Sequence, residues 1–226
     1  YVGVTHEYLS VPCSFQKKIL PKTKCFIYDY GDGGCKTNKF QRDIQLLEKS
    51  FSENPKNTRT IFYLANSYYD IKNYSEAIKY YQKRIELRGW KEEIWYSHYR
   101  LGHIYKILKQ YIKAVHYWLE CTHFNPHRIE NIYEIIKLYR VQEKYQIAYS
   151  FYKMALNMIP VNLCVYHQCL FFHNSVYDYE LDYEFSIIAY YNQEDNIQKP
   201  FLNILRFTDK YTKNLLSNYK YYNNRL

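Results

Sequence analysis

The sequence predicts an all-α fold, a superhelix of helix–turn–helix repeats with a short irregular or β-containing segment at its N-terminal end. Three observations lead to this prediction. Apolar residues recur at helical spacing through much of the 226-residue chain. Three segments in the middle share one internal spacing of small and aromatic residues, and a proline closes the second and third of them.

The repeat becomes visible when the three segments are aligned on Tyr68, Tyr105 and Tyr139. Successive tyrosines are 37 and 34 residues apart. In each segment an alanine follows the tyrosine after nine residues, and a large aromatic residue follows after thirteen. A period of about 34 residues with this pattern is typical of tetratricopeptide (TPR) repeats.

The spacing has a physical reason. Small residues such as Ala65, Gly102 and Ala77 allow the two helices of one unit to cross closely, and the large residues fill the space between neighbouring units. A single unit cannot bury its apolar face alone, so the units must stack. Ile136 departs from the small-residue position, and we expect looser packing there.

The expected elements follow from this register. Residues 1–35 form a separate N-terminal segment, and residues 36–160 form the TPR region. That region begins with a capping helix, whose apolar residues recur at helical spacing. We expect the capping helix at 38–52 and the repeats at about 58–90, 94–126 and 128–160.

Residues 161–226 are expected to form a C-terminal helical cap that ends in a frayed polar tail from residue 211. Within the cap, residues 170–172 and 186–191 are predicted to be helical. Residues 178–184 alternate acidic and apolar side chains, which fits a short strand, a loop or the acidic start of a helix.

Composition narrows the function classes. The net charge of +9 favours acidic partners, but the absence of a long basic run makes nucleic acid an unlikely one. No run of about 18 apolar residues occurs, so no membrane span is expected. The six cysteines form no CxxC motif, and a reducing, cytoplasmic compartment is the default expectation.

An ordered set of short motifs extends beyond the repeats. It begins with Gly3, His6 and Glu7 in a Gly-x-x-His-Glu pattern and continues through 31–33, 39–47, 62–68, 80–84 and 89–93. Over about residues 1–190 this set resembles the C-terminal part of family-two glycosyltransferases that carry a TPR extension. The first motif matches the end of their catalytic domain.

The resemblance implies an upstream α/β domain that binds a nucleotide-sugar and holds a divalent metal, Mn or Mg, through an Asp-x-Asp motif. His6 would be a metal or diphosphate contact, and His6 and Glu7 would be remnants of the transferase site. A single His-Glu pair cannot complete such a metal site. Because the Asp-x-Asp domain is absent from this sequence, we expect no catalytic activity and no cofactor for the chain by itself.

Other possible sites are weaker. The glycine-rich residues 31–34 lack the Lys-Ser/Thr pair of a phosphate loop and are better explained by a tight turn. Cys121, His123 and His127 lie close together but fit no zinc template.

The first helix of each repeat is expected to line a groove that binds a partner. The exposed positions of these helices carry mostly aromatic and basic residues, which suits an extended or helical peptide of acidic character. The predicted groove residues are Arg59, Phe62, Asn66, Tyr69, Tyr96, Tyr99, His103, Lys106, Tyr133, Lys137 and Arg140.

Two functions remain open at this point. The chain is either the helical TPR region of a glycosyltransferase-like protein, which positions an acceptor or partner for an upstream catalytic domain, or a free-standing TPR module for protein–protein interaction. The sequence leaves the sugar donor, the acceptor, the protein partner and the oligomeric state undefined.

Overall fold

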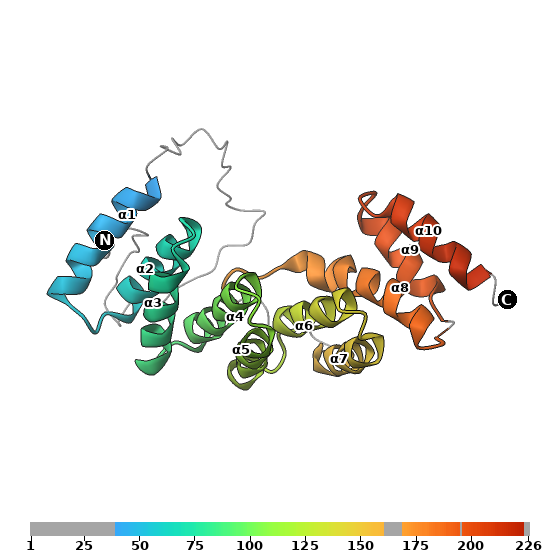
Figure 1. Cartoon of the computed structure of the whole chain (residues 1–226), viewed down its shortest axis with the longest axis horizontal. Coiled ribbons are helices and arrows are strands. Elements are labelled where there is room, and N and C mark those ends of the chain that lie inside the picture. Colours follow the sequence, from blue (N-terminus) through green and yellow to red (C-terminus); the bar gives the residue numbers. More distant parts are fainter. Residues whose placement is uncertain (1–38, 161–168, 195, 224–226) are drawn as a thin grey trace, which may run out of the picture. The chain divides into compact units, whose positions relative to one another are not determined.

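The computed structural model describes residues 39–160, 169–194 and 196–223. Every regular element in these residues is a helix, which confirms the predicted all-α class (Figure 1). The predicted N-terminal segment, with Gly3, His6, Glu7 and the turn at 31–34, lies outside the described residues. The chain divides between Leu87 and Arg88 into two compact units, inside the array of predicted repeats.

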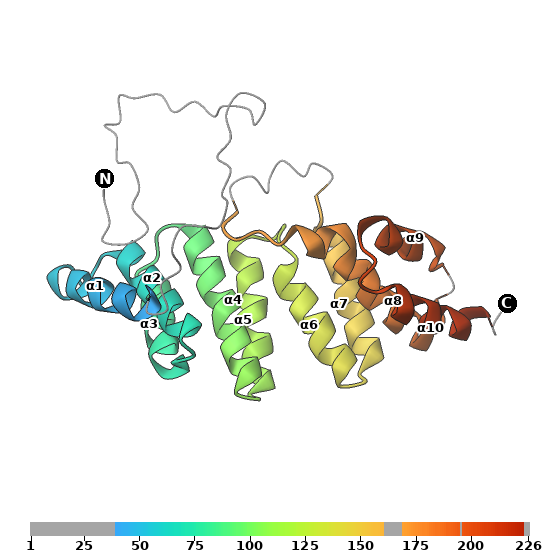
Figure 2. The ribbon, with the colours of Figure 1, turned by 90° about the horizontal axis from the view of Figure 1, so that it is seen from above.

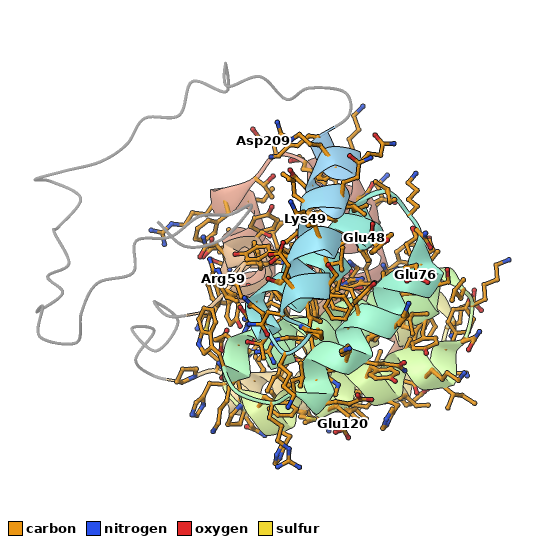
Figure 3. All side chains as sticks on the ribbon, turned by 90° about the vertical axis from the view of Figure 1, so that its left-hand side faces the viewer. Glu48, Lys49, Arg59, Glu76, Glu120 and Asp209 are labelled. Atoms are coloured by element: carbon orange, nitrogen blue, oxygen red, sulfur yellow. The ribbon has the colours of Figure 1, made fainter. Side chains whose placement is uncertain are left out.

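The first unit contains α1 (Lys39–Glu53), α2 (Thr58–Asp70) and α3 (Tyr74–Glu86), and α2 packs against both neighbours. Asn57 and Asn73 cap α2 and α3 because their side chains accept the amides of Thr60 and Glu76. Figure 3 shows Glu48 on α1. The Tyr68 hydroxyl of α2 donates to the carboxylate of Glu48. The predicted capping helix therefore packs against the first repeat as α1.

The second unit contains two helix pairs, followed by a cap. The pairs are α4 (Lys91–Ile107) with α5 (Tyr111–Phe124), and α6 (Glu130–Val141) with α7 (Tyr145–Met158). These four helices lie side by side in Figure 2. A π-helical turn, η2 (Val176–Glu180), leads into the cap, which consists of α8 (Leu181–Tyr191), α9 (Gln198–Phe207) and α10 (Thr212–Asn223).

The small and large repeat residues meet as their spacing requires. Ala77, Ala114 and Ala148 are fully buried. At Gly102 the approach leaves no room for a side chain, because an added Cβ would lie 2.3 Å from Nε1 of Trp118. That nitrogen donates to the Tyr99 carbonyl at 3.2 Å, which satisfies the buried indole.

One turn geometry recurs between paired helices. Lys72, Lys109, Glu143 and Gln193 all have φ between 58° and 62°, in the left-handed region. In each turn this residue's amide donates to the carbonyl three residues earlier, and the next amide donates to the carbonyl five residues earlier. The α8–α9 pair thus has the turn of a repeat, although Gln193 lies more than one period after Glu143.

Two expectations about the C-terminal part need correction, and one open alternative is decided. Residues 170–172 form a turn rather than a helix, because the backbone of Leu170 bonds to side chains of α4 and of the α5–α6 connection. Residues 178–184 are helical, which selects the acidic helix start among the three alternatives. The expected frayed tail contains α10, and the buried Tyr222 hydroxyl of this helix donates to the Ser186 carbonyl at 2.9 Å.

Candidate functional site

The predicted groove residues fall in both units, and each unit is described by itself. In the first unit, Asn66 accepts a hydrogen bond from the Tyr81 hydroxyl at 2.6 Å. Tyr69 meets the edge of Tyr74 at 5.9 Å between ring centroids. Phe62 belongs to the core at 1% exposure, so its predicted exposure is wrong. Arg59 stacks over Tyr63 at 5.0 Å and is half-buried.

Seven groove residues lie in the second unit, and we call them the inner surface. Three of them, Tyr96, Tyr99 and Tyr133, are at most 5% exposed, so their predicted exposure is also wrong. Tyr99 packs between Trp95, at 5.0 Å, and His103, at 4.5 Å. Burial raises the Tyr99 pKa well above its usual value, so this hydroxyl stays protonated. The inner surface comprises Tyr96, Tyr99, His103 and Lys106 of α4 with Tyr133, Lys137 and Arg140 of α6.

The cationic part of this surface is built around one buried carboxylate. Glu134 accepts hydrogen bonds from Nζ of Lys106 at 2.9 Å and from Nζ of Lys137 at 3.0 Å. The carboxylate side chain is 8% exposed, whereas the two lysine side chains are 34% and 31% exposed. Glu134 thus fixes two ammonium groups at positions that solvent reaches.

The pKa values of this cluster follow from its geometry. Burial alone would raise the Glu134 pKa, but neighbouring His103, Lys137 and Lys106 outweigh it and lower the pKa to about 2. Burial lowers the His103 pKa to about 4, so this imidazole is neutral near pH 7. At neutral pH the two lysines therefore hold Glu134 ionised.

Arg140, the last predicted groove residue, is engaged by the cap. Its guanidinium forms an ion pair with Glu184 of α8 through Nε and Nη2, and the Glu184 side chain is only 3% exposed. Lys137 also lies over the Tyr133 ring at 4.7 Å. Arg140 accordingly joins α6 to α8 and contributes less to the open cationic surface than the two lysines.

A second charged cluster was not predicted from the sequence. Arg128, 1% exposed in its side chain, donates to Glu92 at 2.8 Å and to Glu130 at 2.7 Å. Its guanidinium lies 3.5 Å from the centre of the Trp95 ring. Asn125 donates to the other oxygen of Glu92 at 3.0 Å. Nothing in the spacing distinguishes Arg128 from a surface arginine in a loop between repeats.

This second cluster holds residues 169–177, which we call the crossing segment. The segment passes the N-terminal ends of α4 and α6 (Figure 2). The Leu170 amide donates to Glu92 at 3.1 Å, and Arg128 donates to the Leu170 carbonyl at 3.1 Å. Phe171 packs on Tyr96 at 4.5 Å, and Tyr177 accepts the Ile129 amide at 3.1 Å and donates to Glu130 at 2.6 Å.

Groups for metal catalysis do not gather in this part of the protein. Among the described residues, no three His, Cys, Asp or Glu side chains are close enough to hold a metal ion. Cys121 is fully buried, and burial raises its thiol pKa well above the usual value. No helix of the described ranges is long and apolar enough to cross a membrane.

Comparisons with known proteins agree with this fold. Residues 59–89 and 96–127, which overlap the first and second predicted repeats, match the family described as "Tetratricopeptide repeat". No curated protein sequence matches the chain.

Similar solved structures have helical repeats. A crystal structure of MamA aligns with 83% of this chain and 99% of its own, at 17% identity and TM-score 0.57. PilF of Pseudomonas aeruginosa aligns with 74% of this chain and 68% of its own, at 15% identity and TM-score 0.55. YrrB, a TPR protein with an unusual peptide-binding site, aligns over 81% and 84% at 14% identity and TM-score 0.54. At these identities the similarity establishes the fold alone.

Proposed function

We propose that this chain is a protein–protein interaction module of the TPR type, and that the inner surface of its second unit binds a protein segment with an acidic side chain. The observation that supports this most directly is the pair of ammonium groups that Glu134 holds in place. Two partly exposed lysines surround one buried carboxylate, so the cluster carries a net positive charge near pH 7.

The geometry favours an acidic side chain in this position. Lys106 and Lys137 are already oriented by Glu134, so less side-chain entropy is lost when a partner's carboxylate approaches them. Aromatic rings lie beneath these charges, since Lys137 lies over the Tyr133 ring at 4.7 Å and Lys106 over the Trp118 ring at 5.7 Å. Aromatic and cationic residues together are common anchors of protein interfaces. The peptide-binding site of YrrB adds support from a protein of the same fold.

Charge-neutral variants test this proposal. The double variant Lys106→Gln/Lys137→Gln removes the cluster's positive charges, and Lys113→Gln/Lys153→Gln removes the same number from exposed positions on α5 and α7. Peptides selected from a random display library on the wild-type protein are measured by fluorescence anisotropy at two salt concentrations. We expect the selected peptides to be enriched in Asp and Glu.

The two double variants should differ clearly. Loss of two close charge contacts should weaken binding by about tenfold or more in the inner-surface variant and leave the outer variant within about twofold. Equal weakening in both variants would indicate attraction by overall charge and would contradict the proposed site.

The sequence resemblance supports a second candidate function, a TPR region that serves a glycosyltransferase. It rests on the Gly-x-x-His-Glu pattern of Gly3, His6 and Glu7 and on the motifs that follow it. In that case the groove would position an acceptor, and the upstream domain would bind a nucleotide-sugar with Mn or Mg. The test compares binding of nucleotide diphosphates with Mn²⁺ or Mg²⁺ by this chain and by the longest native form. Binding by the longer form alone, lost in His6→Ala, would support this candidate, and binding by neither would exclude it.

A further inference from the structure

Residues 169–173 lie on the inner surface much as a bound peptide would. The Leu170 amide and carbonyl are both bonded, to Glu92 and Arg128 respectively, through backbone atoms that every non-proline residue has. Phe171 then packs on Tyr96, and His173 lies 5.9 Å from Tyr99 between ring centroids. The receiving residues come from α4 and from the connection to α6, far from residue 170 in sequence.

The receiving site is held in place by groups outside the crossing segment. Asn125 and Arg128 orient Glu92, whereas Glu130 and the Trp95 ring orient Arg128. None of these four contacts involves residues 169–177. Glu92 and Arg128, which bond to the Leu170 backbone, would therefore remain organised if residues 170–172 moved away.

The contact made by Phe171 is the weakest part of this arrangement. Its side chain is 48% exposed although it touches Tyr96. Its φ of 49° lies in the left-handed region, which L residues rarely adopt. Tyr177, in contrast, is fixed by two hydrogen bonds to Ile129 and Glu130. The segment is thus anchored at Tyr177, on which Phe172 also stacks at 4.6 Å, and is held more weakly at Phe171.

We propose that residues 170–172 are an internal ligand, and that a partner segment replaces them on Glu92, Arg128 and Tyr96. The partner would bond to Glu92 and Arg128 through the backbone of one residue and place an aromatic residue directly after it on Tyr96. This inference rests on the proposed function and adds a second requirement to the partner, an aromatic side chain besides the acidic one. A partner that binds without the left-handed residue would form the same backbone bonds with a more common conformation.

Competition with a synthetic peptide tests the proposal. The probe has the sequence of residues 169–175 with an N-terminal fluorophore, and a scrambled peptide serves as its control. The protein variants are Phe171→Ala, which weakens the internal ligand, and Phe207→Ala, which removes an equally exposed phenylalanine (48%) from α9. Both variants truncate half-exposed rings, so both should fold.

We expect the probe to bind Phe171→Ala about three- to tenfold more tightly than wild type, the range that one aromatic contact provides. Phe207→Ala should bind it as wild type does. Adding the probe to wild type should also speed hydrogen exchange of the Leu170 amide, because the probe displaces the bond to Glu92. Equal probe affinity in all three proteins, or no binding by Phe171→Ala, would overturn the internal-ligand proposal.

Acidic peptides without aromatic residues separate this proposal from the function on which it rests. If they bind wild type through Lys106 and Lys137 while the probe fails to compete for the Leu170 site, the interaction module stands and the internal ligand is rejected. If neither peptide class binds, both proposals fail.

Discussion

Replacement of Arg128 by methionine should destabilise the second unit strongly. Methionine keeps a side chain of similar length but removes the guanidinium, which lies over the Trp95 ring and donates to Glu92, Glu130 and the Leu170 carbonyl. Glu130, whose side chain is 1% exposed, would keep the Tyr177 hydroxyl and lose its counter-charge. Breaking a buried ion pair from one side costs about 3–5 kcal/mol, a large fraction of the roughly 5–15 kcal/mol that holds a typical domain folded.

Urea unfolding followed by tryptophan fluorescence measures how far the free energy of unfolding of the second unit falls. The chain has three tryptophans, Trp90, Trp95 and Trp118, and all of them lie after the division between Leu87 and Arg88. The control is Arg206→Met, which makes the same change at an exposed arginine of α9 and should alter the free energy of unfolding by at most about 0.5 kcal/mol.

A double variant tests whether the uncompensated charge of Glu130 causes the loss of stability in Arg128→Met. In Arg128→Met/Glu130→Gln the uncompensated charge of Glu130 is gone, so the combined cost should be clearly smaller than the sum of the two single costs. If Arg128→Met costs less than about 1 kcal/mol, or if the two costs simply add, the buried ion pairs do not stabilise the unit as argued.

Three further changes test other parts of the structure. Gly102→Ala should lower the unfolding free energy by about 1–3 kcal/mol in the same urea assay, because the new Cβ meets the Trp118 ring, and an unchanged value would contradict this close packing. Lys109→Gly should raise it by about 1 kcal/mol by relieving a φ of 59°, whereas the control Glu120→Gly, inside α5, should lower it by a similar amount. Burial and the nearby His116 and His123 lower the His98 pKa to about 4, so the stability that neutral His98 contributes is complete above about pH 6.5 and is lost as the pH falls through 4. His98→Phe should remove about 3 kcal/mol of that pH dependence in urea titrations between pH 7 and 4, and an unchanged slope would refute the assignment.

Much of the fold could be predicted from the sequence because repeats make local patterns redundant. The three alanines, the tyrosines on which the repeats align and the closing prolines each recur, so one departure such as Ile136 does not obscure the period. The α8–α9 pair escaped this pattern, since its spacing from the preceding repeat is longer and Gln198 stands five residues after Gln193, where the other pairs have alanine. Only the backbone of its turn, with Gln193 at a φ of 59°, shows the relation.

The site could be predicted only in part, and the reason is physical. Repeat register assigns residues such as Lys106 and Lys137 to the inner face of a first helix, but it does not show that both bond to Glu134. It cannot show what covers that face. Tyr96 was expected to be open, but Phe171, about 75 residues away in the chain, packs on it.

The buried charges link the two proposals to the stability of the unit. Arg128 bridges Glu92 in the first turn of α4 and Glu130 in the first turn of α6, and the same guanidinium donates to the backbone at Leu170. Arg128 thus joins two repeats and also binds a backbone carbonyl of the crossing segment, so the same side chain serves stability and the proposed ligand site. Loss of Arg128 should therefore weaken the unit and release residues 170–172 together, whereas Phe171→Ala should release them and leave the unfolding free energy within about 1 kcal/mol of wild type. Only a crossing segment that is a replaceable ligand, rather than a required part of the core, would separate the two variants in this way.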